Sequence, residues 1–340
     1  MSINRRQFTK LCAQSMGLSL FAACQMLPPP ARPNGQSPAN TPSVGNANPQ
    51  PTAAPLTQAT TPSTNVTGYS FAAFSSTVTT RQDATNLYIE SNGMPSHPMM
   101  IGIKSWQQQV PLPQNYRGSS AFQIPLQPVM ADTPISAKTA LYRGAIAIAA
   151  NGIPIFNALN NRGDDALLAG ELDQWGGHCG KGDDYHYHVA PLHLEATVGV
   201  GKPIAYALDG FAIYGSTEPD GSPVTPLDEF NGHMGSDGVY HYHGTTTYPY
   251  INGGLRGVVT VTDDQIEPQP HIHPVRPPQE PLRGAEITNF QVVGNGAYSL
   301  EYTLNNAKYY VNYTVTDTTC VFEFIDANGT KTSETYQIPQ

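Results

Sequence analysis

The sequence predicts a mainly β protein: a β-rich domain with long loops and an internal two-copy repeat, followed by a small C-terminal antiparallel β module. Gly and Pro each number 31 among the 340 residues, a composition that favours turns and short strands over long helices. Short β-prone runs recur along the chain between Gly, Pro and Asn residues. A long motif also occurs twice, the second copy lying 55 residues after the first (Leu172 to Leu227).

The β-rich domain is expected over residues 69–263. Its β-prone segments include residues 86–90, 99–104 and 144–149, which are short and bounded by turn-forming residues. One short helix is expected at residues 164–174, where an Asp begins the segment and three Leu side chains fall on one side.

The chain continues with a linker and a small module. Residues 264–283 are rich in Pro and Gln and are expected to form the linker. Residues 284–340 contain three β-prone runs, and the sequence from Asp326 to Gly329 is typical of a hairpin turn. Because so small a module has only a marginal core of its own, we expect it to pack against the main domain.

The first 23 residues resemble a twin-arginine-type lipoprotein signal. Arg5 and Arg6 are paired, and an apolar run leads to Leu-Phe-Ala-Ala-Cys24, which is similar to a lipobox. Cleavage before Cys24 makes it the expected lipidation site, so we expect an exported protein, lipid-anchored on the periplasmic side of a membrane or at the cell surface. The alternative is a plain secretory signal that is cut after Ala23. Residues 24–68, rich in Pro, Thr, Ala and Asn, are expected to be a disordered tether.

The net charge of the chain limits the kinds of molecule that it is expected to bind. Asp and Glu number 26 and Lys and Arg 17, which gives a formal net charge of -9. Because no cluster of Lys and Arg is present to neutralise phosphates, nucleic acid is not an expected partner. The expected partner is the membrane, through Cys24, and a small-molecule or glycan ligand stays open.

The duplicated motif carries the candidate chemistry. Its copies share Leu, Asp, an aromatic residue, Gly, His, a sulfur-containing residue, Gly and Tyr-His-Tyr-His in the same order. Side chains alternate between the faces of a strand, so the histidines of each Tyr-His-Tyr-His point to one face and the tyrosines to the other. A Gly-containing turn lets the earlier histidine fold back beside them. The candidate metal ligands are His178, His186 and His188 in the first copy and His233, His241 and His243 in the second.

These matched triplets predict a transition-metal cofactor, because imidazole binds zinc, copper, iron and nickel. Cys179 and Met234 follow the first histidine of each copy. Sulfur atoms bind soft copper, so copper is a candidate metal in addition to zinc. Asp173 and Asp228 are also matched and are candidates for orienting a ligating histidine. One shared site, a dinuclear site and two separate sites all remain open.

Two further groups of residues are ambiguous. Cys179 and Cys320 remain after removal of the signal and lipidation of Cys24, and they either form a disulfide or act separately. His271 and His273 lie in the Pro-rich linker and are expected to be solvated.

With these motifs, residues 86–259 resemble the YHYH-domain family. The likeness is carried by Trp-Gly-Gly-His-Cys-Gly (175–180), Asp-Tyr-His-Tyr-His (184–188), Leu-Asp-Gly-Phe-Ala-Ile-Tyr-Gly (208–215), Tyr-His-Tyr-His (240–243) and Tyr-Pro-Tyr-Ile-Asn-Gly-Gly (248–254). The resemblance implies a secreted or cell-surface protein and supports the histidine site, but it implies no particular reaction. The residues from 284 onward lie outside it.

We therefore expect an exported lipoprotein that binds copper or zinc through the duplicated His and His-x-His motifs. A metalloenzyme, either a copper or iron oxidase or a zinc hydrolase, is a second hypothesis, because three protein nitrogens with an open position suit catalysis. A surface adhesion or glycan-binding module with structural histidines is the third. Catalytic residues are not assigned, because the sequence contains no recognised nucleophile triad, phosphate loop or dinucleotide motif.

Overall fold

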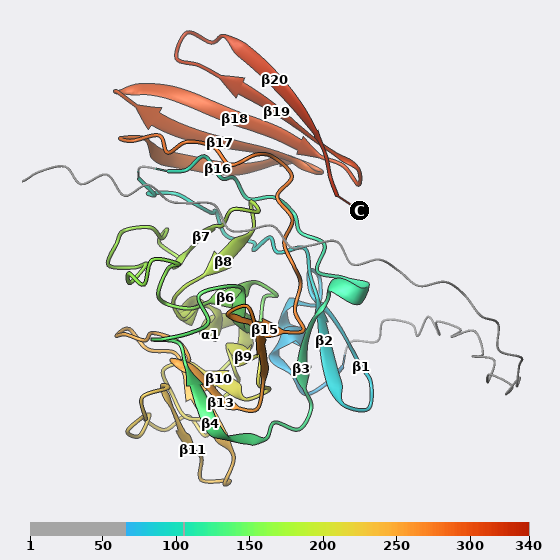
Figure 1. Ribbon diagram of the computed structural model, residues 1–340, viewed down its shortest axis with the longest axis vertical. Helices are drawn as coiled ribbons and strands as arrows, with labels where there is room; N and C mark the ends of the chain where they lie inside the picture. Colours follow the sequence, from blue (N-terminus) through green and yellow to red (C-terminus); the bar gives the residue numbers. More distant parts are fainter. Residues whose placement is uncertain (1–65, 105, 340) are drawn as a thin grey trace, which may run out of the picture. The chain divides into compact units, whose positions relative to one another are not determined.

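The computed structural model describes residues 66–104 and 106–339, which form five sheets (Figure 1). The described helices are short: η1 (Ser70–Phe74), η2 (Gly118–Ser120), η3 (Leu192–Leu194) and α1 (Glu195–Val198). None of them is long and apolar enough to cross a membrane. The mainly β fold class is confirmed. The signal, Cys24 and the tether up to residue 65 lie outside the described residues.

The largest sheet has eight short strands in the order β11-β12-β10-β9-β5-β6-β8-β7. These strands are β5 (Ala145–Ala149), β6 (Pro154–Phe156), β7 (Gly177–Cys179), β8 (Tyr185–Tyr187), β9 (Ala205–Ala207), β10 (Ala212–Tyr214), β11 (Gly232–Met234) and β12 (Tyr240–His243). The two Tyr-His-Tyr-His motifs therefore lie near opposite edges of one sheet.

The two halves of this sheet pair in the same way. β6 runs parallel to β8 through Ile155 and Tyr187, and β10 runs parallel to β12 through Ile213 and Tyr242. β7 with β8 and β11 with β12 are antiparallel, and β5 pairs with β9 at the centre. The two-copy repeat stays an inference from the sequence, with which this pairing agrees.

The core explains the apolar runs. All five residues of β5 are buried, which is why this strand is continuously apolar rather than alternating. Burial of a side chain such as Ile146 or Ile148 stabilises the fold by about 1.5–3 kcal/mol. Tyr185 and Tyr187 are also fully buried, as expected if the tyrosines of the motif pack into the core.

Three smaller sheets complete the main domain. Their strands are β1 (Thr79–Gln82), β2 (Asn86–Glu90) and β3 (Phe122–Pro125); β4 (Met130–Ser136) with β13 (Gly254–Gly257); and β14 (Thr260–Thr262) with β15 (Gln265–Glu267). In β2 the buried residues Leu87 and Ile89 alternate with half-buried ones, as in a strand with one face on the core.

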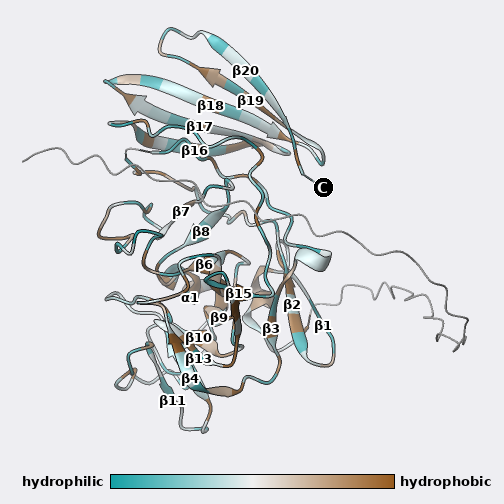
Figure 2. Cartoon of the chain, viewed as in Figure 1, coloured by the Kyte–Doolittle hydropathy of each residue, from teal (hydrophilic) through white to brown (hydrophobic). Residues whose placement is uncertain are grey.

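The C-terminal residues form a five-stranded antiparallel sheet, as predicted. Its strands are β16 (Glu286–Gly294), β17 (Ala297–Leu304), β18 (Ala307–Val315), β19 (Thr319–Ile325) and β20 (Lys331–Gln337), paired in sequence order. Hydrophilic and hydrophobic residues intermingle along them (Figure 2). The turn from Asp326 to Gly329 closes with a backbone hydrogen bond of 3.0 Å. The sheet contacts the main domain through Ile287, whose amide donates to the Ile103 carbonyl over 3.0 Å.

The helix expected at residues 164–174 is not formed. This stretch consists of turns and coil, and Leu167 and Leu168 are 41% and 80% exposed. Gly163 and Gly170 have positive φ angles of 82° and 71°, which interrupt right-handed helical backbone at both positions. The prediction was wrong because Leu167 and Leu168 do not belong to an apolar face.

Residues 264–283, expected as a linker, are in part tied to the main domain. Gln269 accepts a hydrogen bond from the Ala145 amide over 2.8 Å. Arg276 is buried and forms an ion pair with Asp183 at 2.8 Å. Gln269, His271 and His273 also line the cavity beside the first histidine triplet, so this segment helps to form the surroundings of that triplet.

Candidate metal centre

The first group of histidines lies at one edge of the eight-stranded sheet, where β8 and β7 are the last two strands. His178 in β7 lies opposite His186 in β8, and His188 is two residues further on, so the last two share a face. Nε2 of His188 lies 3.2 Å from Nε2 of His186 and 3.0 Å from Nε2 of His178. The structure thus brings together the three histidines predicted from the first copy.

The other ring nitrogen of two of these histidines faces hydrogen-bond acceptors. Nδ1 of His188 lies 2.5 Å from the carbonyl oxygen of Asn157. Nδ1 of His186 lies 3.0 Å from the carbonyl oxygen and 3.2 Å from a carboxylate oxygen of Asp184. In a neutral ring the nitrogen that faces an acceptor carries the proton, so Nε2 of both rings carries a lone pair.

Burial disfavours the charged form of two rings of this group, His178 and His188. It lowers the pKa of His188 to about 3, with a further contribution from His186. It also lowers the pKa of His178 well below the usual value, together with the other two histidines, although a hydrogen bond to the backbone of Glu171 acts in the opposite direction.

The lone pairs on Nε2 of His186 and His188 face each other at 3.2 Å, which is unfavourable unless a cation lies between them. A tetrahedral zinc ion with nitrogen ligands at 2.0–2.1 Å places those nitrogens about 3.3 Å apart. The separations of 3.0 and 3.2 Å between the Nε2 atoms are close to this value. The first group therefore has the spacing of a metal site.

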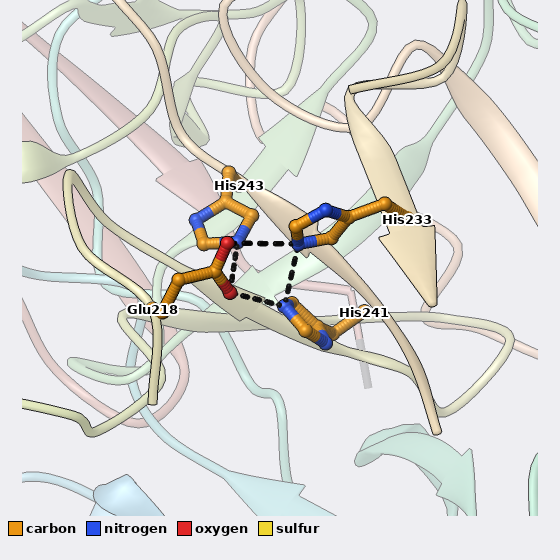
Figure 3. A group of neighbouring side chains, drawn as sticks. All are labelled: Glu218, His233, His241 and His243. Carbon is orange, nitrogen blue, oxygen red and sulfur yellow. Dashed lines mark hydrogen bonds and ion pairs between the residues drawn. The ribbon is translucent and has the colours of Figure 1, made fainter. Parts of the chain in front are cut away.

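The second group lies at the opposite edge of the sheet and has four members. His233 in β11 and His241 and His243 in β12 are joined by Glu218 from the loop after β10 (Figure 3). Oε2 of Glu218 lies 3.2 Å from Nε2 of His241 and 3.5 Å from Nε2 of His243. Oε1 lies 3.3 Å from Nε2 of His233, which is 3.0 Å from Nε2 of His241.

Neighbouring groups orient these ligands as well. Nδ1 of His243 lies 3.0 Å from the carbonyl oxygen of Gly215. Thr225 holds two ligands at once: its hydroxyl lies 2.7 Å from Nδ1 of His233, and its amide donates to Oε1 of Glu218 over 3.0 Å. Such contacts fix ring orientation in metal sites.

The sequence argument missed Glu218, which lies outside the duplicated motif. Burial alone would raise the pKa of Glu218, but hydrogen bonds from Thr225 and His241 outweigh it, so the pKa lies below the ordinary value. The carboxylate is therefore ionised, as a metal ligand must be. Glu218 makes the second group a set of three nitrogens and a carboxylate.

The two matched aspartates do not orient histidines. The hydroxyls of Tyr185 and Tyr240 donate to Asp173 and Asp228, each over 2.9 Å. Asp173 also accepts hydrogen bonds from the backbone amides of Trp175 and Gly177, at the turn that leads into β7. Asp228 accepts the equivalent bonds from Phe230 and Gly232, at the turn that leads into β11. Among the described residues neither bonds to a histidine ring, so they hold the tyrosines and the turns instead.

The sulfur residues lie away from both groups. Met234 follows His233 on β11 and is 57% exposed, because neighbouring side chains of a strand point to opposite faces. Cys179 is buried and belongs to neither group, and burial raises the pKa of its thiol well above the usual value. Cys179 and Cys320 are both free thiols, so the disulfide alternative is not observed.

Comparison with known proteins agrees with the resemblance in the sequence. Residues 121–225 match the model of the YHYH protein family. The chain contains a YHYH domain. The matched part of the YHYH domain includes the first histidine group and Glu218, and it ends before His233. No curated protein and no solved structure matches the chain.

Proposed function

We propose that this protein is an exported lipoprotein whose YHYH domain binds two transition-metal ions at separate sites. The observation that carries the proposal is the convergence of three imidazole nitrogens in each group, with Nδ1 of His186, His188 and His243 held by acceptors. Hydrogen bonding within a core does not require three Nε2 atoms to face one another. A bound cation does.

The donor atoms favour zinc or copper(II). Both groups consist of imidazole nitrogens, with one carboxylate in the second. Cys179 and Met234, whose sulfur atoms supported copper in the sequence, do not belong to either histidine group. Nitrogen and oxygen donors suit the borderline ions zinc and copper(II).

Metal content per chain tests this proposal. Wild-type protein is expected to hold two ions, and the variants His186→Ala/His188→Ala and His241→Ala/His243→Ala one each. The matched control is His271→Ala/His273→Ala, another His-x-His pair that belongs to neither group, which is expected to keep both ions. Plasma mass spectrometry on protein purified without chelator or affinity tag gives the count. Equal loss of metal in the control variant would contradict the assignment.

Export and anchoring are part of the same proposal. They rest on the paired Arg5 and Arg6 and on Cys24 at the end of the apolar run. Mass spectrometry of the mature protein is expected to find a chain that begins at Cys24 and carries a lipid. A mature chain that begins elsewhere would contradict the anchor.

A further inference from the structure

The loop after β6 and the loop after β10 are equivalent parts of the two halves of the sheet, but they carry different residues at one equivalent position. The Asn160 amide donates to the Asp164 carbonyl over 2.8 Å, and the Glu218 amide donates to the Ser222 carbonyl over 2.9 Å. Each bond closes the same turn, in the loop that follows the strand paired in parallel with β8 or β12. Asn160 therefore occupies in the first half the position that Glu218 occupies in the second.

Asn160 does not replace Glu218 as a ligand. Its side-chain oxygen accepts the amides of Arg162 and Asp164, over 2.9 and 3.1 Å. Its side-chain nitrogen donates to the Glu171 carboxylate, over 3.3 and 3.2 Å. Glu171 itself lies outside the histidine group. The first site thus has three nitrogen ligands, and among the described residues no carboxylate takes the fourth position of a tetrahedral ion.

A large cavity lies next to this open position. It has a volume of about 960 Å³, and His178, His186 and His188 all line it. None of the four residues of the second group lines it. His178 is partly exposed, so the first site is in contact with the space from which a ligand enters.

Basic side chains outnumber acidic ones in the lining of this cavity. Asp and Glu outnumber Lys and Arg by 26 to 17 overall, yet four basic side chains and only two acidic ones line the cavity. The basic ones are Lys104, Arg143, Arg162 and Lys181, and the acidic ones are Glu171 and Asp184. Arg162 pairs with Glu171 and Asp164, and Lys104 pairs with Glu286, so among the described residues Arg143 and Lys181 are the basic side chains of the lining that form no ion pair. A cleft with this excess of basic groups attracts anions.

We propose that the first metal site keeps an exchangeable fourth position, at which a small oxygen anion from solution, a carboxylate or a phosphate, binds the metal inside this cavity. The second site is closed by Glu218 and holds its metal for structure. This inference rests on the proposed function, since it requires metal at both sites. Three protein nitrogens with one exchangeable position is also the arrangement that metal catalysis requires.

Azide binding to copper(II)-loaded protein tests the inference. Azide that coordinates copper(II) produces a new charge-transfer absorption band. His241→Ala/His243→Ala, which retains only the first site, is expected to show a saturable azide band. His186→Ala/His188→Ala, which retains only the second site, is expected to show none. Acetate and inorganic phosphate are then added as competitors, and the one that displaces azide at lower concentration identifies the class of anion.

A second variant leaves all six histidines in place. Asn160→Glu introduces into the first half the carboxylate that the second half has. It is expected to retain two ions per chain while its azide affinity falls by about tenfold or more, because a protein ligand now takes the exchangeable position. Asn161→Glu, at the next and exposed position, places the same charge in the lining of the cavity without matching Glu218; it is the control and is expected to lower azide affinity much less than Asn160→Glu.

The possible failures are distinguishable. If neither single-site variant binds copper, the proposed function and this inference fall together. If both bind copper and give the same azide response, or if Asn160→Glu binds azide as the wild type does, metal binding stands and the inference is wrong. Azide that neither acetate nor phosphate displaces would overturn the oxygen-anion class.

Discussion

Removal of metal is expected to lower the melting temperature of the protein by on the order of 10 °C for each site. A ligand present at about a thousand times its Kd stabilises the folded state by about 4 kcal/mol. For a folded unit of this size, 1 kcal/mol moves the melting temperature by about 2–4 °C. The effect arises because the ligands converge only in the folded sheet, so that metal binding is coupled to folding. Thermal denaturation with EDTA and with added zinc measures it.

The single-site variants provide the control for this effect. His241→Ala/His243→Ala and His186→Ala/His188→Ala are each expected to keep about half of the metal-dependent stabilisation, and the variant that combines all four substitutions none. A melting temperature that is the same with zinc and with EDTA would show that the histidines stabilise the fold without metal.

Loss of the buried Arg276 is expected to be the most damaging single substitution away from the metal ligands. Nε and Nη2 of Arg276 bond to the two carboxylate oxygens of Asp183 over 2.9 and 2.8 Å. Its guanidinium also lies 4.7 Å from the ring centroid of Phe322 in the C-terminal sheet. Arg276→Ala leaves the Asp183 carboxylate buried without its partner, which costs about 3–5 kcal/mol.

Chemical denaturation of the metal-free protein measures this loss without interference from metal binding. Arg283→Ala is the matched control in the same segment, because Arg283 is exposed, and it is expected to change the free energy of unfolding by less than about 0.5 kcal/mol. A similarly small change for Arg276→Ala would show that the ion pair with Asp183 does not hold this segment to the domain.

The histidine groups were the most predictable part of the molecule. The alternation of a strand placed His186 and His188 on one face and Tyr185 and Tyr187 on the other, and the structure has this arrangement. The fold class followed from turn residues and β-prone runs, which are local signals. These features need no information from distant parts of the chain.

Glu218 and Arg276 show what local patterns cannot provide. Glu218 contacts its histidines from a loop outside the duplicated motif. Because the equivalent residue in the first half is Asn160, a comparison of the two halves does not identify Glu218 as a ligand. Arg276 lies in a Pro-rich segment that resembles a solvated linker, and only its partner Asp183, distant in sequence, makes it part of the fold. The expected helix at 164–174 was wrong because spacing alone does not show whether Leu167 and Leu168 face a core.

The central claim is that the two groups are metal sites. The most direct test is the number of metal ions per chain in wild-type protein that has been exported by its own signal and purified without chelator. We predict close to two ions of zinc or copper. Protein that holds no metal, and takes up none when titrated with zinc and copper(II), would contradict it and would leave the histidines as structural residues of the sheet.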